Sequence, residues 1–108
     1  MSLSCFVEDG QSRDGYLPES PRIHGALRFR YRPALAEERF QFLKAKDYSG
    51  EDEVKRIAKL INSHLESWDA PLEKNEANIR KLHPNLLTRL LDVVMGYTAP
   101  EEANDAKN

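Results

Sequence analysis

The stretch GALRFRYRPALAEER, residues 25–39, joins a strand pattern to a helix pattern. In its first part, large apolar side chains alternate with three arginines, Arg28, Arg30 and Arg32. Such alternation predicts a half-buried β-strand over about residues 23–32. Pro33 ends this strand because proline has no N–H to donate, and its fixed φ suits the first turn of a helix. The stretch therefore predicts a strand that passes directly into a helix over about residues 33–46.

Two further amphipathic helices are predicted, over about residues 51–68 and 84–95. The first keeps its apolar side chains on one face as far as Trp68. The second is rich in leucine, opens at Pro84 and ends where a glycine can adopt a positive φ. One strand and three helices indicate an α+β, mostly helical domain.

The chain divides into three predicted parts. Residues 1–22 carry glycine, proline and charge and are expected to form a flexible arm, or a short strand followed by a linker. Residues 23–97 form the single globular domain, and residues 98–108 form a disordered hydrophilic tail. A lone strand leaves its edges unpaired, so we expect residues 3–7, a second copy of the chain or a partner to pair with residues 23–32.

Composition limits the class of protein. The 108 residues are 40% hydrophobic and 31% charged, which is typical of a soluble globular domain. The net charge of −2 does not supply the positive field that steers proteins to nucleic acids. The single cysteine, Cys5, has no partner for a disulfide within the chain, which favours a reducing compartment. The sequence has no basic leader typical of secretion and no apolar run of about 18 residues typical of a membrane span. We therefore expect a cytoplasmic protein.

No motif indicates catalysis, a cofactor or a metal. His24, His64 and His83 lack the i, i+4 spacing of a helical metal site. The acidic clusters fall in predicted first turns of helices, where carboxylates complement the helix dipole. We therefore expect a protein that is not an enzyme and that holds no cofactor and no metal.

Three interpretations remain open for the arginine stripe: a solvated face, a protein contact, or a nucleic-acid grip by Arg28, Arg30 and Arg32. The nucleic-acid interpretation is the weakest. On a strand the arginines and the aromatic side chains project from opposite faces, so base stacking and phosphate contact would not share one side.

Two apolar features are each compatible with a core or with a partner surface. Trp68, the sole tryptophan, either plugs the core or anchors a partner. The leucine-rich helix covers more than one narrow stripe, so part of it could face another chain. Its residues in question are Leu86, Leu87, Leu90, Leu91 and Val94.

The order of these features resembles the small tail assembly chaperones of long-tailed bacteriophages over about residues 26–97. The resemblance is carried by a strand ending in YRP, a helix opening with ALAEER, a helix ending in SWD, and the segment IRKLHPNLLTRLLDVVMG. Its hallmark residues are Tyr31, Arg32, Pro33, Trp68, Asp69, Leu82 and Pro84.

The resemblance implies a non-enzymatic chaperone in the host cytoplasm. Such a chaperone binds the tape-measure protein, keeps it soluble and helps to recruit tail-tube subunits. The partner-binding residues expected on this basis are Tyr31, Arg32, Trp68, Leu86, Leu87, Leu90, Leu91 and Val94, and self-association is a further possibility. The alternative functions are a structural tail or virion component and a small nucleic-acid-binding regulator.

Overall fold

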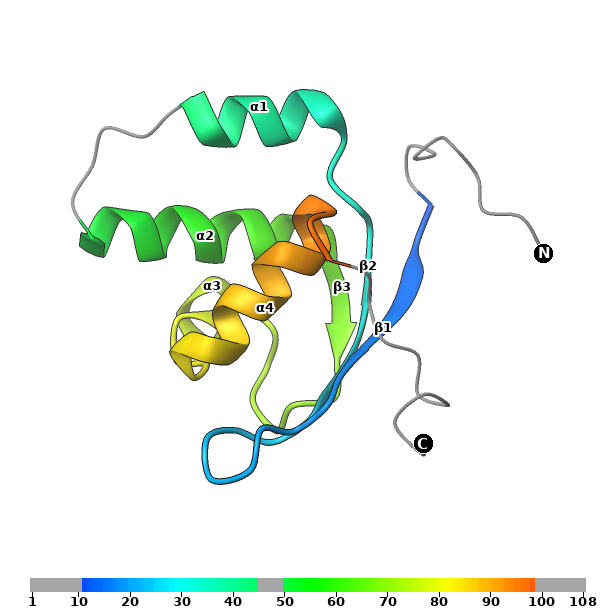
Figure 1. Cartoon of the computed structure of the whole chain (residues 1–108), viewed down its shortest axis with the longest axis vertical. Coiled ribbons are helices and arrows are strands. Elements are labelled where there is room, and N and C mark those ends of the chain that lie inside the picture. Colours follow the sequence, from blue (N-terminus) through cyan, green and yellow to red (C-terminus); the bar gives the residue numbers. More distant parts are fainter. Residues whose placement is uncertain (1–10, 45–49, 99–108) are drawn as a thin grey trace.

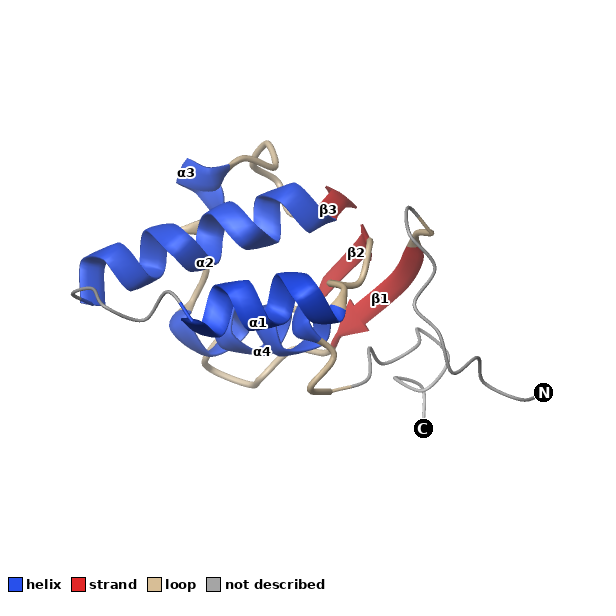
Figure 2. Cartoon of the chain, turned by 90° about the horizontal axis from the view of Figure 1, so that it is seen from above, coloured by secondary structure: helices blue, strands red, loops and turns tan. Residues whose placement is uncertain are grey.

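The computed structural model describes residues 11–44 and 50–98. Within these residues, three strands form one antiparallel sheet and four helices lie on one side of it (Figures 1 and 2). The strands are β1 (Arg13–Leu17), β2 (Leu27–Tyr31) and β3 (Leu65–Trp68). The helices are α1 (Ala36–Lys44), α2 (Gly50–His64), α3 (Glu76–Ile79) and α4 (Pro84–Met95). The predicted mixed α+β class is therefore confirmed.

The central strand β2 follows the predicted alternation. Leu27, Phe29 and Tyr31 are buried beneath the helices, whereas Arg28 and Arg30 are exposed on the opposite face. The strand is shorter than the expected range of 23–32, because the chain turns before it and Ser20 and His24 form an isolated bridge.

Strand β1 corrects the prediction for the N-terminal arm. It pairs antiparallel with β2 along its whole length, from Arg13 opposite Tyr31 to Leu17 opposite Leu27. Gly15 permits this pairing, because the ring of Phe29 occupies the space where a side chain at position 15 would lie. Residues 3–7, one of the expected sources of the paired strand, lie outside the described residues.

Strand β3 corrects the predicted helix over residues 51–68. Helix α2 ends at His64, and the next four residues form a strand that pairs with β2, with Trp68 opposite Phe29. The register shifts between Arg30 and Tyr31, so the strand accommodates one extra residue as a β-bulge. Pairing with the central strand outweighs the helical spacing of Leu65 and Trp68, which the sequence pattern had favoured.

The remaining helices agree with the sequence to different degrees. Helix α1 begins three residues after Pro33, and its described part ends at Lys44. The short helix α3 adds a fourth helix to the three longer ones expected; the Asn75 side chain caps it by accepting a hydrogen bond from the N–H of Asn78. Helix α4 has the predicted bounds and ends at Gly96, whose φ is 81°.

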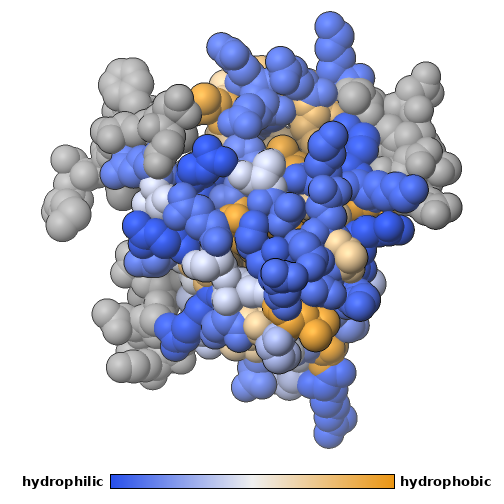
Figure 3. Space-filling model, turned by 180° about the vertical axis from the view of Figure 1, so that it is seen from behind, coloured by the Kyte–Doolittle hydropathy of each residue, from blue (hydrophilic) through white to orange (hydrophobic). Residues whose placement is uncertain are grey.

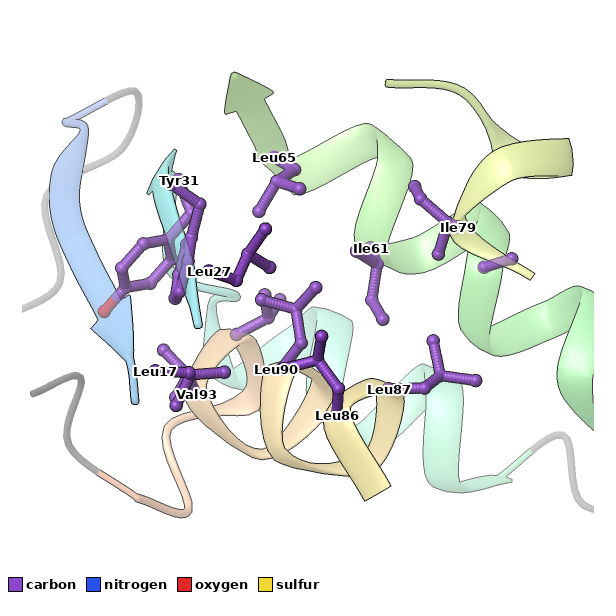
Figure 4. Packing of buried hydrophobic residues seen from close by; sticks show 13 residues of the cluster. Leu17, Leu27, Tyr31, Ile61, Leu65, Ile79, Leu86, Leu87, Leu90 and Val93 are labelled. Atoms are coloured by element: carbon purple, nitrogen blue, oxygen red, sulfur yellow. The ribbon is translucent and has the colours of Figure 1, made fainter. Parts of the chain in front are cut away.

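The core lies between the sheet and helices α2 and α4 (Figure 4). Strand β2 contributes its three inward side chains, α2 contributes Ala58 and Ile61, and α4 contributes the largest share. No helix in the described segments is long and apolar enough to cross a membrane. The predicted tail lies outside the described residues from position 99 onward.

Candidate functional site

On the outer face of the sheet, Arg28 and Arg30 of β2 contact side chains from the neighbouring strands β1 and β3. The Arg28 guanidinium lies over the ring of Tyr16 at 4.7 Å. Arg30 Nη1 lies 2.9 Å from the carboxylate of Asp14, and its Nε lies 3.6 Å from that of Glu66. Two carboxylates thus offset the charge of Arg30, which makes this arginine a poorer contact for a phosphate backbone.

Arg32 does not share the exposed face of Arg28 and Arg30, because it lies beyond the end of β2. Its guanidinium donates a hydrogen bond of 2.7 Å to the carbonyl of Ser63, and its backbone N–H donates to the carbonyl of His64. Arg32 therefore connects the residues after β2 to the C-terminal end of α2 through two hydrogen bonds.

The two aromatic residues expected at a partner surface belong mainly to the core. Tyr31 is 1% exposed, and burial raises the pKa of its hydroxyl, with Arg13 acting in the opposite direction. Trp68 is half-buried against the core, and its indole N–H donates to the carbonyl of Leu72. Leu72 itself is 51% exposed, so the indole of Trp68 lies between the core and an exposed apolar side chain.

The leucine-rich helix α4 turns its apolar side chains inward. Four of the residues expected to meet a partner are buried, and Leu91 is partly buried against them. The buried four are Leu86, Leu87, Leu90 and Val94. A partner cannot contact these buried side chains while the domain stays folded. An apolar surface that could bind a partner must therefore lie outside the buried face of α4.

Helix α1 provides that surface. None of its nine residues is buried, and Phe40 is 67% exposed. Figure 1 shows α1 at one end of the molecule, running beside α2. Phe40 and Phe42 are two positions apart, which places them on different sides of a helix. The sequence therefore contains a signal that one of the two rings is exposed.

Tyr97 lies beside this helix and extends the surface. It is 50% exposed, and the guanidinium of Arg39 lies 4.1 Å above the centre of its ring. The same guanidinium donates two hydrogen bonds, of 2.8 and 3.1 Å, to the carbonyl of Met95. We call Phe40, Arg39 and Tyr97 the α1 surface.

Polar contacts hold α1 in place. The carboxylate of Glu38 lies 2.9 Å from Nε2 of His64, which is itself 3% exposed. Nδ1 of His64 lies 2.9 Å from the carbonyl oxygen of Arg32. Near the other end, Arg56 donates to the carbonyl of Phe42, and its guanidinium lies 4.2 Å from the centre of that ring.

The opposite side of the domain offers less apolar surface. Figure 3 views the molecule from behind, where α2, α3 and β3 form a mainly hydrophilic face with small apolar areas. The described residues contain no group of three or more histidine, cysteine, aspartate or glutamate side chains placed to hold a metal ion. The α1 surface is thus the strongest candidate for an interaction site.

Comparison with known proteins adds no relative to this description. No family model matches the chain, and neither a curated protein nor a solved structure matches it significantly.

Proposed function

We propose that this protein is a non-catalytic binding protein that uses the α1 surface to hold a helical partner, the tape-measure protein of a long-tailed bacteriophage. The observation that carries the binding role is that α1 buries none of its residues and leaves Phe40 67% exposed. The choice of partner comes from the resemblance of residues 26–97 to tail assembly chaperones.

The chemistry of the α1 surface suits a helix with an apolar stripe. Aromatic and arginine side chains are the types most enriched among residues that dominate binding energy. Phe40 supplies an aromatic ring, while Arg39 and Tyr97 supply a stacked pair whose outer side is still accessible. An amphipathic helix can cover such a surface with its apolar face and leave its polar face in water.

The location of the α1 surface also favours reversible binding. The apolar core lies between the sheet, α2 and α4, so covering Phe40 does not require the core to open. A chaperone that releases its client benefits from a surface of this kind, because binding and release leave the domain folded.

The resemblance to the family would place the expected contacts in Tyr31, Trp68 and the leucine-rich helix. Their burial supports a different use of these residues: they build the hydrophobic core of the domain. The charge of Arg30 is offset by Asp14 and Glu66, which gives the nucleic-acid alternative little support.

Co-expression tests the proposal. The tape-measure protein of the same phage should be insoluble alone and should become soluble, in a complex, when this chain is present. A tape-measure protein that is equally insoluble with and without the chain would contradict the proposal. Mass spectrometry of purified phage particles tests the structural alternative, because a chaperone should be absent from finished tails.

A further inference from the structure

A shallow hollow of about 440 Å³ lies where the connection between β1 and β2 meets the first half of α4. It is distant in sequence from the α1 surface, and its lining comes from two segments. The lining residues are Ser20, His24, Asn85, Thr88 and Arg89. Each of them carries a nitrogen or hydroxyl group, and none carries a carboxylate.

Arg89 brings a positive charge to this hollow. Its Nη1 lies 3.1 Å from the carbonyl oxygen of Pro18 and 3.2 Å from Nε2 of His24. Because a guanidinium can only donate, the ring nitrogen of His24 accepts in this contact. No carboxylate within residues 11–44 and 50–98 forms an ion pair with Arg89, although the residue is partly buried. A partly buried cation without a counter-charge favours an anion beside it.

Side-chain donors without a partner among the described residues line the same hollow. Nε and Nη2 of Arg89 have no hydrogen-bond partner among the described residues, and the same holds for the hydroxyl of Ser20 and the side-chain amide of Asn85. The backbone N–H of Asn85 is already bound by Nδ1 of His83, at 3.3 Å. The free donors of the hollow are therefore side chains rather than the end of the helix.

We propose that this hollow binds a phosphate group, with Arg89 as the counter-charge and with Ser20 and Asn85 as neutral donors. A guanidinium matches the geometry and charge of phosphate oxygens well. Donors that approach from the β1–β2 connection on one side and from α4 on the other suit a tetrahedral group, whose oxygens point in several directions. The phosphate is either free or esterified, and the same contacts serve both.

A titration of the full-length chain, followed by amide NMR, tests this site. The probes are inorganic phosphate, glycerol phosphate as a monoester, and acetate as a planar carboxylate. We expect both phosphate probes to shift the amides that line the hollow, and the tighter of the two identifies the source of the group. Acetate should bind more weakly than either.

The decisive variant is Asn85→Asp, which places a carboxylate in the hollow without changing its shape. It should weaken phosphate binding by about tenfold or more through like-charge repulsion. An acidic residue in the first turn is favourable for a helix, so thermal unfolding should show an intact fold. Asn62→Asp is the matched control: it adds the same charge in α2, where the side-chain oxygen accepts from Lys74, and should leave phosphate binding unchanged.

Three results would overturn the site. They are an equal loss of binding in the two variants, shifts spread over surface lysines rather than the lining residues, and acetate binding as tight as that of phosphate. None of these results depends on α1, so the failure of this proposal is distinguishable from failure of the proposed chaperone role.

Discussion

Glu38 in α1 and His64 at the end of α2 are joined by a contact of 2.9 Å between carboxylate and imidazole. The ring of His64 is buried, and its other nitrogen lies 2.9 Å from the carbonyl oxygen of Arg32. One ring nitrogen of His64 thus faces a carboxylate oxygen, and the other faces a backbone carbonyl oxygen. The pair therefore links α1, the end of β2 and the start of β3 at a single buried side chain.

Removing the carboxylate should loosen α1. Glu38→Ala leaves a buried ring nitrogen without its partner and removes the oxygen that accepts from the N–H of Leu35. We expect the free energy of unfolding to fall by about 1 to 2 kcal/mol, with amide hydrogen exchange rising more in α1 than in α4. Glu37→Ala is the matched control, because Glu37 is exposed in the same turn. Equal effects of the two variants would show that the contact with His64 does not hold the helix.

Leu90 should behave as a core residue. It is fully buried in α4, so Leu90→Ala should lower the free energy of unfolding by about 2 to 5 kcal/mol in chemical denaturation. Phe40→Ala should cost less than about 1 kcal/mol, because two thirds of the Phe40 side chain is already in water. A cost of less than about 1 kcal/mol for Leu90→Ala would instead place Leu90 at a surface.

Gly15 should not tolerate a side chain. A Cβ atom at this position would lie 2.5 Å from two ring carbons of Phe29, so Gly15→Ala forces that ring to shift in the core. We expect a loss of about 1 to 3 kcal/mol in thermal or chemical unfolding. Gly25→Ala is the control, since nothing lies within 4 Å of the added methyl group. A Gly15→Ala variant as stable as the control would contradict the pairing of β1 with β2.

Alkaline pH should destabilise the fold through Tyr31. Burial raises the pKa of its hydroxyl in the folded state, so above about pH 10 the unfolded chain releases this proton first. The unfolded state then binds fewer protons than the folded state, and stability falls as pH rises towards the folded pKa. Tyr31→Phe should lose this part of the alkaline dependence in unfolding measured across that range. An unchanged dependence would show that the hydroxyl is not buried.

The elements with strong local signals were predictable from the sequence. Helix α4 has a proline at its first turn and a glycine after its last residue, and its expected bounds agree with the structure. The alternation in β2 likewise identified its buried face. In these two elements local chemistry and tertiary packing favour the same conformation.

The elements that depend on distant pairing were not predictable. Strand β1 contains glycine and charge, and only the neighbouring Phe29 explains why Gly15 belongs in a strand. In β3, Leu65 and Trp68 fit a helical face as well as a strand, so pairing with β2 decides between them. The exposure of α1 depends on whether the core between α2 and α4 reaches it. The spacing of apolar residues within one helix does not show this.

Binding through the α1 surface is tested most directly by measuring capture of the co-expressed tape-measure protein with two matched variants. Phe40→Ala removes the exposed ring of the α1 surface, whereas Leu72→Ala removes an exposed apolar side chain near β3. Phe40→Ala should lose most of the captured partner while retaining its fold, and Leu72→Ala should capture as much as the original chain. Undiminished capture by Phe40→Ala would show that the α1 surface does not hold the partner.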